Sequence, residues 1–246
     1  MEPAHPEWIV PNWPAPANVK AFITTRAGGV SRGPFASLNL GLRAGDDPQA
    51  VAANRVRLRS ALPQDPKWLR QIHGSRVADA DAVADTPEAD ASLARHPGTV
   101  CAVMVADCIP VLLTDRAGSL VAIAHAGWRG LVCGVIENAV NACGRNAEEL
   151  LAYLGPGIGP RAFEVGPDVR DAFLALDSKS EAAFAPHLPG KWLADLFLLT
   201  RQRLQRAGVS GIYGGGLCTY SDAARFFSYR RERTTGRMAA LIWRTD

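Results

Sequence analysis

The sequence predicts an α/β fold built on a mixed sheet. Short apolar runs typical of buried strands outnumber the segments that have helical spacing. Many neighbouring runs are joined by short links, which favours a mixed sheet over a regular alternation of parallel strands and helices. At 246 residues with 48% hydrophobic side chains, the chain has a globular composition and the length of one large domain, residues 1–246.

The elements of the first half follow in order along the chain. An irregular, Pro- and Trp-rich lead-in precedes a strand over Val19–Thr24, and a Gly-rich loop follows it. Asp47–Leu62 begins with Asp-Pro and stops before Pro63, which predicts a helix. The remaining predictions are a surface loop over Asp79–Asp90 and strands over Trp68–Ile72, Val100–Val105, Val111–Thr114 and Leu120–Ala124.

The second half alternates helices and strands. Leu131–Cys143 has apolar residues at helical spacing and is followed by Gly144, a common end signal of helices. Two further helices are predicted, over Asp168–Leu176 and Asp195–Ala207. Strands are predicted over Arg161–Val165, Gly211–Tyr213 and Met238–Trp243, with Phe226–Tyr229 as a further candidate.

Charge and composition exclude several classes of protein. The formal net charge is +3 and no block of like charges occurs, so no nucleic-acid partner is expected. The N-terminus does not resemble a signal peptide, and no run approaches the roughly 20 apolar residues of a membrane span. Five cysteines without a CxxC pair suit free thiols in a reducing compartment. We therefore expect a cytoplasmic protein without a membrane partner.

Three residues that carry chemistry lie where apolar runs stop. His73 follows a short run in LRQIHGSRV, Cys108 separates two runs in VMVADCIPVLL, and His125 ends the run in SLVAIAHAGWRG. Strand ends converge at one edge of a sheet, so these side chains could meet. Two histidines and a cysteine suit zinc and leave a fourth position open, and copper is a less favoured alternative.

The residues alone leave other interpretations open. A single histidine at a strand end is more often a hydrogen-bonded structural residue, and a single buried cysteine is more often a small apolar side chain. Taken together, a cysteine and two histidines also fit a thiol nucleophile with its base. From this pattern, a metal site and a cysteine hydrolase are about equally supported.

Six ordered blocks of the chain resemble one known family. They are TTRAGGVSRGPFASLNLG, QIHGSRV, ADCIPVLL, AHAGWRG, GPGIGPRAFEVG and CTYSDAARFFSYRRERTTGRMAALIW. The resemblance is to the YfiH or laccase-domain family, also called multicopper polyphenol oxidase-like or DUF152. It implies a layered α/β/β/α sandwich with mixed sheets, a fold grouped with cysteine deamidase toxins. It also implies that His73, Cys108 and His125 bind one zinc ion.

The activity that the resemblance implies is purine nucleoside phosphorolysis. Adenosine, inosine or methylthioadenosine would react with phosphate to give the free base and ribose 1-phosphate, and adenosine deamination is also attributed to the family. The older name implies copper-dependent oxidation of phenols. Five histidines in the whole chain are too few for a multicopper oxidase, so the sequence argues against that activity.

Further residues are candidates for handling substrate. The zinc deaminase signatures H-x-E and P-C-x-x-C are absent, so Asp107 beside Cys108 becomes the candidate acid or base, with a structural carboxylate as the alternative. The candidate anion-binding and ribose-binding residues are Arg26, Arg55, Arg129 and Asn39. Phe226, Phe227 and Tyr229 could stack on a purine, although core packing is expected for at least two of them.

Two other functions remain as alternatives. One is a cysteine hydrolase or amidase that acts on peptidoglycan precursors, with Cys108 as the nucleophile. The other is a non-catalytic partner of cell-division or envelope proteins, which the polar constellation makes the weaker hypothesis. For the leading hypothesis, the expected partners are a purine nucleoside and phosphate, and the expected state is a monomer.

Overall fold

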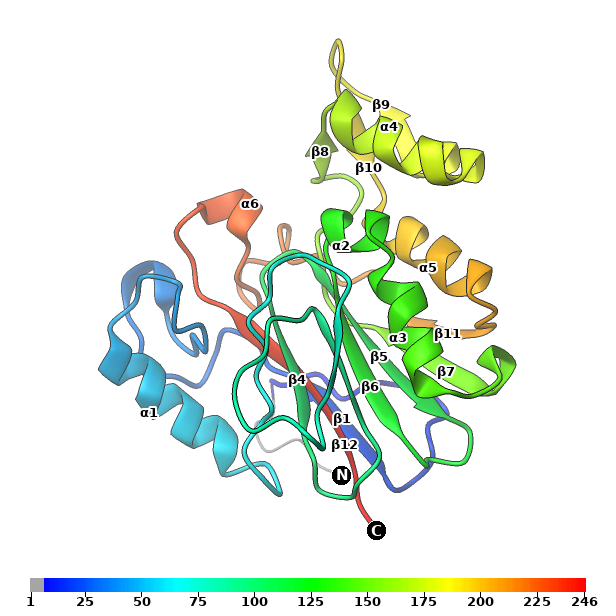
Figure 1. Cartoon of the computed structure of the whole chain (residues 1–246). Coiled ribbons are helices and arrows are strands. Elements are labelled where there is room, and N and C mark those ends of the chain that lie inside the picture. The colour runs from blue at the N-terminus through cyan, green and yellow to red at the C-terminus, as the bar shows by residue number, and fades with distance from the viewer. Residues whose placement is uncertain (1–6) are drawn as a thin grey trace.

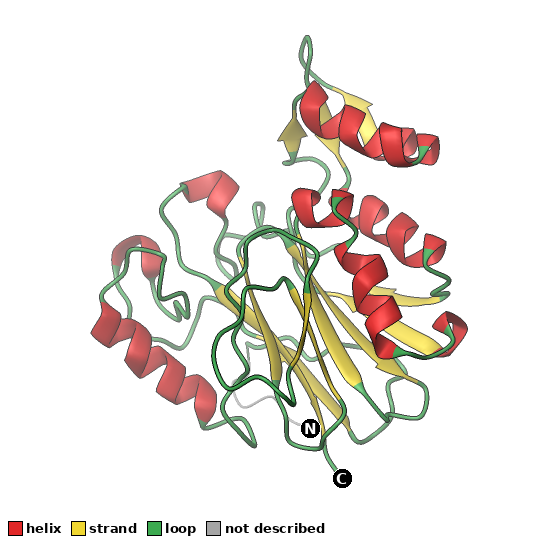
Figure 2. Ribbon diagram, in the orientation of Figure 1, coloured by secondary structure: helices red, strands yellow, loops and turns green. Residues whose placement is uncertain are grey.

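Four layers make up the molecule, in the order helix, sheet, sheet, helix (Figures 1 and 2). The computed structural model describes residues 7–246. Three clusters of buried side chains fill the three spaces between the layers. The predicted α/β class with mixed sheets is confirmed, and so is the α/β/β/α layering that the family resemblance implied.

The larger sheet has six strands in the order β11-β7-β5-β6-β3-β2. Its central strand β5 runs antiparallel to both neighbours, whereas the two outer pairs, β11 with β7 and β2 with β3, are parallel. The sheet is therefore mixed. Its strands are β2 (Val77–Asp79), β3 (Ala91–Ala94), β5 (Ile109–Asp115), β6 (Val121–Ala126), β7 (Leu150–Leu154) and β11 (Gly211–Gly214).

The smaller sheet is antiparallel and packs against the larger one. Its order is β1 (Val19–Ile23), β12 (Met238–Arg244) and β4 (Cys101–Val105). The last strand of the chain, β12, therefore lies between two strands from the first half of the sequence. Val103 and Ile242 of this sheet lie in one buried cluster with Leu112, Ile123 and Tyr153 of the larger sheet. Because both faces of each sheet are covered, β5 reads as a continuous apolar run rather than an alternating one.

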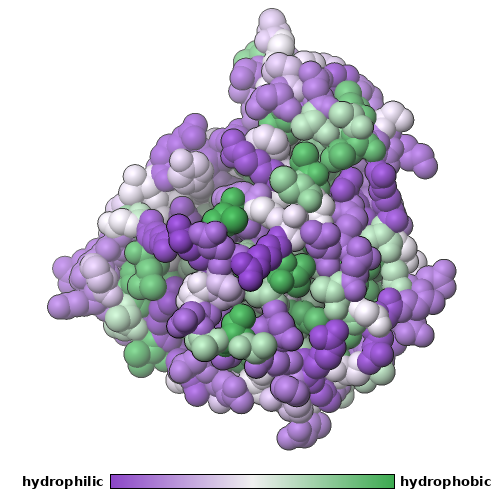
Figure 3. All heavy atoms as spheres, viewed as in Figure 1, coloured by the Kyte–Doolittle hydropathy of each residue, from purple (hydrophilic) through white to green (hydrophobic). Residues whose placement is uncertain are grey.

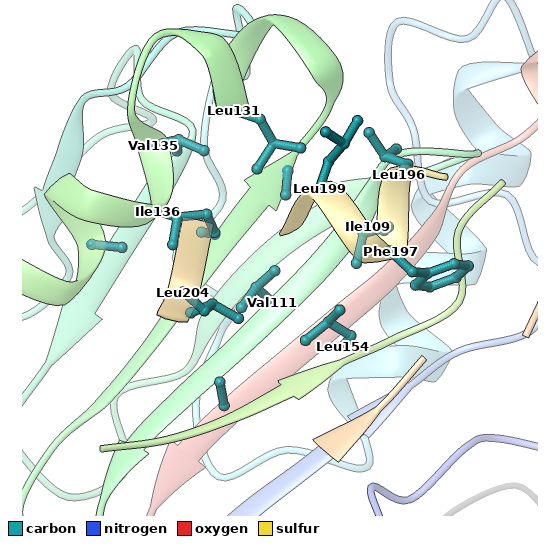
Figure 4. Packing of buried hydrophobic residues seen from close by; sticks show 14 of the residues in the cluster. Ile109, Val111, Leu131, Val135, Ile136, Leu154, Leu196, Phe197, Leu199 and Leu204 are labelled. Carbon is teal, nitrogen blue, oxygen red and sulfur yellow. The ribbon is translucent and has the colours of Figure 1, made fainter. Parts of the chain in front are cut away.

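Helices cover the two outer faces. Helix α1 (Pro48–Arg59) begins at Asp47, whose carboxylate accepts a hydrogen bond from the Gln49 N–H, and it packs on the small sheet through Leu58. Helices α2 (Trp128–Val132), α3 (Val135–Cys143) and α5 (Leu196–Arg206) cover the large sheet. Figure 4 shows Leu and Ile side chains of these helices meeting those of β5 and β7.

A small lobe rises from one end of the sandwich (Figure 1). It contains a second three-stranded sheet, in the order β8 (Glu164–Val165), β10 (Trp192–Ala194) and β9 (Phe184–Pro186), and helix α4 (Pro167–Leu176). Helices α2 and α6 (Tyr229–Glu232) lie at the same end. Short 3-10 turns occupy Gly33–Phe35, Ala147–Glu149 and Ser178–Ala183.

Three predicted elements differ from the structure. The predicted strand over Trp68–Ile72 forms only isolated bridges at Lys67 and Arg70, and the candidate strand over Phe226–Tyr229 is an irregular segment that leads into α6. The predicted helix over Leu131–Cys143 is interrupted after Val132, because Gly134 has φ +87°. The sequence prediction also missed β7, and it missed β2, β3, β9 and β10, which are short and lack a strong apolar run.

The surface carries polar side chains with scattered apolar areas between them (Figure 3). Among residues 7–246, no helix is both long enough and apolar enough to cross a membrane.

Candidate metal centre and active site

The structure brings His73, Cys108 and His125 together. One ligand atom from each lies within 4.8 Å of the other two, and Cys108 Sγ is 3.9 Å from His73 Nε2. Cys108 lies in the turn between β4 and β5, and His125 lies near the end of the adjacent strand β6. His73 comes from the irregular segment before β2, and its ring packs edge to face on that of His125 at 4.9 Å.

His73 is held in an unusual backbone conformation. Its φ is +59°, which is uncommon for a residue with a side chain. The backbone N–H groups of Ile72, His73 and Gly74 all donate to the carboxylate of Asp90, at 3.1, 3.0 and 2.7 Å. The turn that presents His73 is therefore built around one buried acidic side chain.

The same carboxylate also contacts His125. Asp90 Oδ1 lies 2.9 Å from His125 Nδ1, and the His125 N–H donates to the Asp90 carbonyl oxygen at 2.7 Å. With Nδ1 engaged, Nε2 is the His125 nitrogen available to a metal ion or to Cys108. Burial opposes ionisation of Asp90, but its hydrogen bonds from His125 and Gly74 outweigh this and lower the pKa of the carboxyl group.

Charge is separated within the cluster. Burial opposes ionisation of Cys108, yet the charge of His125 and hydrogen bonds from both histidines lower the pKa of the thiol to about 6. Burial also disfavours the charged imidazole of His125, but Cys108 and Asp90 raise its pKa to about 9. Without a metal ion, the pair therefore favours a thiolate beside an imidazolium.

The donor set fits zinc. Zinc prefers thiolate and imidazole ligands, and tetrahedral coordination places its sulfur and nitrogen ligands roughly 3.6 Å apart. The observed separation of 3.9 Å between Cys108 Sγ and His73 Nε2 is close to that value. His125 is buried, whereas His73 is exposed and Cys108 half-buried, so the cluster is enclosed on one side and open on the other. This matches a three-ligand site with room for one further ligand.

The open side of the cluster faces a cavity of about 780 Å³. Asp107 is the one acidic residue on the part of its wall that the structure describes, and seven arginines line the same wall. Such a wall creates a positive potential that favours anions. The arginines are Arg43, Arg55, Arg70, Arg129, Arg230, Arg233 and Arg237.

Two predicted substrate residues lie on this wall. The Nε of Arg55 donates to the Leu40 carbonyl oxygen at 3.0 Å, and its guanidinium lies 4.4 Å from the centre of the Trp68 ring. Burial lowers the pKa of Arg55. Arg129 is exposed and stacks on Trp128 at 4.6 Å. Both side chains can reach an anion in the cavity, which is consistent with the predicted role.

The other two predicted residues lie outside the wall. Arg26 donates to the Ala36 and Ala223 carbonyl oxygens and forms a salt bridge with Glu232. Asn39 is buried, and its Oδ1 accepts hydrogen bonds from the backbone N–H groups of Gly41 and Arg237. The structure does not bring these two side chains to the cavity, so their substrate-binding role remains a sequence prediction.

Asp107 borders the cavity, but both of its carboxylate oxygens are engaged. Oδ1 accepts a hydrogen bond from Thr219 Oγ1 at 2.6 Å, and Oδ2 accepts one from the Arg230 N–H at 2.7 Å. Its backbone has φ +102°, and its carbonyl oxygen accepts from the Ile158 N–H. These contacts match the structural alternative, while its place on the wall keeps the acid or base hypothesis open.

Several residues of the site were missed from the sequence. Asp90 was assigned to the end of a surface loop, although its position directly before the short strand β3 buries it completely. Arg237 was missed because its neighbourhood resembles a loop, yet it lies close enough to influence Cys108 and Asp107 electrostatically. Of the three candidate stacking aromatics, Phe226 and Phe227 are core residues, as expected, and Tyr229 lines the cavity.

The fold and this three-ligand site define the class of protein. The family described as multi-copper polyphenol oxidoreductase laccase matches residues 20–245, so the chain belongs to that family. Solved structures agree. A Neisseria meningitidis protein of the DUF152 family is 51% identical, with a TM-score of 0.93, and the match covers 98% of this chain and all of that one. YlmD from Geobacillus stearothermophilus is 33% identical, with a TM-score of 0.87 and coverage of 94% and 93%.

Curated relatives are similarly close over their whole length. A Pseudomonas aeruginosa protein named purine nucleoside phosphorylase is 53% identical, covering 97% of this chain and 99% of its own. The Escherichia coli protein named purine nucleoside phosphorylase YfiH is 55% identical, covering 96% and 98%.

Proposed function

We propose that this protein is a zinc-dependent purine nucleoside phosphorylase. Adenosine, inosine or methylthioadenosine and phosphate would give the free base and ribose 1-phosphate. The names of the Pseudomonas aeruginosa and Escherichia coli relatives support this activity. The five free thiols suit a reducing compartment, so we place the enzyme in the cytoplasm. We expect the enzyme to act as a monomer.

One observation carries the proposal: a metal-ligand cluster and an arginine-rich wall share a single cavity. Phosphorolysis brings a phosphate dianion to a neutral nucleoside, so the site must attract an anion and orient it. Guanidinium groups match the geometry of phosphate oxygens. A multicopper oxidase of phenols would not need an anion-binding wall, and it would need more histidines than this chain has.

The reaction exchanges one bond for another at the ribose. An oxygen of phosphate forms a bond to C1′ while the C1′–N9 bond breaks, and the electron pair of that bond remains on the purine. The base then takes up one proton. Arg55 and Arg237 would hold the phosphate oxygens, and the positive wall would offset negative charge that develops during the transfer. Tyr229, whose side chain is exposed at the cavity, would pack against the purine.

The metal would be held by His73 Nε2, Cys108 Sγ and His125 Nε2. A zinc ion bound there supplies a Lewis acid with one open position for a substrate atom. Asp107 is the candidate proton donor or acceptor, since it is the acidic residue beside Cys108 on the described wall. Adenosine deamination, in which water replaces the 6-amino group and ammonia leaves, is a second reaction that we assign to the same site.

The test is base release from purified protein of known metal content, with and without phosphate. We expect one zinc ion per chain, and free base with ribose 1-phosphate only when phosphate is present. Cys108→Ala should lose both the zinc and the activity. A zinc-loaded protein that releases no base from any of the three nucleosides would refute the proposal.

A second candidate function is supported by a specific contact. Asp90, His125 and Cys108 form the order carboxylate, imidazole, thiol that is found in cysteine nucleophile sites. In this alternative, metal-free protein would act as a hydrolase or amidase on peptidoglycan precursors. Zinc-free protein that hydrolyses such a precursor through a covalent Cys108 adduct would support it, and inhibition of that reaction by zinc would be expected.

A further inference from the structure

We infer that Asp90 is a positioning residue of the metal centre, whose single buried carboxylate fixes both histidine ligands at once. This inference rests on the proposed metal site and identifies a residue outside the ligand set that determines its affinity. Asp90 is fully buried, and its carboxylate is shared between His125 and the turn that carries His73.

The contact with His125 sets which ring nitrogen faces the metal. An ionised carboxylate only accepts hydrogen bonds, so the His125 Nδ1 that lies 2.9 Å from Asp90 Oδ1 must carry a proton. Nε2 then presents its lone pair to the cluster. The hydrogen bond from the His125 N–H to the Asp90 carbonyl oxygen fixes the backbone of the same residue. Asp90 therefore fixes both the position and the tautomer of this ligand.

The contacts with the His73 turn set the backbone position from which the His73 side chain projects. Three consecutive N–H groups, those of Ile72, His73 and Gly74, converge on the two oxygens of Asp90. They hold His73 at φ +59°, a conformation that a free chain rarely adopts at a residue with a side chain. Without the carboxylate, the three N–H groups would lose their acceptor, and the hydrogen bonds that stabilise this conformation of the turn would be absent.

The two contacts act on segments that are distant in sequence. The segment between His73 and His125 contains strands β2 to β5 and most of β6. Both residues nevertheless hydrogen-bond to the same carboxylate. Movement of either ligand relative to the other therefore breaks a hydrogen bond to Asp90. This coupling is what a metal site needs, since its ligands must be held at short, fixed separations before the ion binds.

A carboxylate elsewhere in the chain provides a matched control. Asp115 is also buried and accepts hydrogen bonds from the N–H and Oγ of Ser119, with Arg145 nearby at 3.4 Å. It lies at the end of β5 opposite to Cys108. Replacing Asp115 by Asn disturbs a buried, hydrogen-bonded carboxylate of the same kind without touching the metal centre.

The experiment compares zinc binding in Asp90→Asn and Asp115→Asn by competition with a chromophoric chelator. Asn has one acceptor oxygen and one amide nitrogen that only donates, so it cannot replace both carboxylate oxygens. If its oxygen takes the Oδ1 position, which accepts from His125 and the His73 N–H, its amide nitrogen faces the Ile72 and Gly74 N–H groups and leaves them without an acceptor. We expect Asp90→Asn to weaken zinc binding roughly 10- to 100-fold. The thiolate-to-metal band of the cobalt-substituted protein should weaken in parallel. Asp115→Asn should stay within about twofold of the wild type.

A measurement on the wild-type protein keeps the inference testable if Asp90→Asn does not fold. Long-range ¹H–¹⁵N spectra of the zinc-loaded protein should show His125 protonated at Nδ1 and metal-bound through Nε2. Metal bound through Nδ1 would overturn the inference. So would an Asp90→Asn protein with unchanged zinc affinity, or an equal loss in Asp115→Asn. A wild-type protein that binds no zinc would instead refute the metal site itself, and the inference with it.

Discussion

Adding one methyl group at Gly127 tests the geometry of the cluster directly. A Cβ at this position would lie 2.8 Å from Cys108 Sγ and 3.1 Å from His73 Cδ2. Ordinary contacts begin near 3.4 Å, so the sulfur would have to move by about 0.6 Å and the ring by about 0.3 Å. The backbone of Gly127, at φ −82° and ψ 162°, is one that alanine adopts without strain.

Gly127→Ala should therefore weaken zinc binding while leaving the fold intact. Metal sites tolerate errors of about 0.2 Å in ligand distances, so the displacement predicts a loss of roughly tenfold or more in zinc affinity. The free energy of unfolding of the metal-free protein should change by less than about 1 kcal/mol. Chelator competition measures the first quantity and urea denaturation the second.

Gly74→Ala is the matched control for this experiment. It adds the same methyl group in the turn beside His73, where the nearest heavy atom would be Ile72 Cγ1 at 3.5 Å, an ordinary contact. Its zinc affinity should remain close to that of the wild type. Unchanged zinc binding in Gly127→Ala would refute the view that Cys108 and His73 occupy their ligand positions in this structure.

Three further predictions test the phosphate-binding role of Arg237, the ionisation of the Cys108 thiol and the backbone conformation of Gly134. Arg237→Ala should raise the KM for phosphate about tenfold or more with little effect on the KM for nucleoside, because a charge-assisted hydrogen bond is lost; equal effects on both KM values would argue against a phosphate role. In metal-free protein, the rate of Cys108 alkylation by iodoacetamide should be half-maximal near pH 6 and level off above about pH 7 to 8, since the thiol is half ionised at its lowered pKa and almost fully ionised one to two pH units above it. Cys101 and Cys143, where burial raises the pKa to about 12, should stay unmodified in the same peptide map. Gly134→Ala should lower the free energy of unfolding by about 1 kcal/mol, because φ +87° strains a residue with a Cβ; thermal unfolding without a loss of stability would contradict this.

The sequence predicted the parts of the fold that have strong local patterns. Five strands lie close to their predicted ranges because each is a marked apolar run: β1, β4, β5, β6 and β12. Three helices do so because each begins with an Asp-Pro, Gly-Pro or Asp capping signal: α1, α4 and α5. The break between α2 and α3 was missed because a single glycine inside a helical pattern does not reveal its φ. The short strands β2, β3, β9 and β10 were missed because tertiary pairing, rather than local sequence, makes them extended.

The site was predictable only in part. His73, Cys108 and His125 were singled out because each lies where an apolar run stops and because the family resemblance implied a ligand set, and the structure brings them together. Asp90 was not found, because nothing in an Ala- and Asp-rich stretch distinguishes the one carboxylate that folding buries from those that stay exposed. The arginine wall was also invisible, since its members come from separate segments that meet only in the folded chain.

The proposed reaction transfers the ribose of a purine nucleoside to phosphate. The most direct test is ³¹P NMR of zinc-loaded protein incubated with inosine and phosphate. We expect a ribose 1-phosphate resonance that grows in step with free hypoxanthine and is absent for Cys108→Ala. Hypoxanthine without the phosphate ester, or no reaction in protein shown to carry zinc, would contradict it.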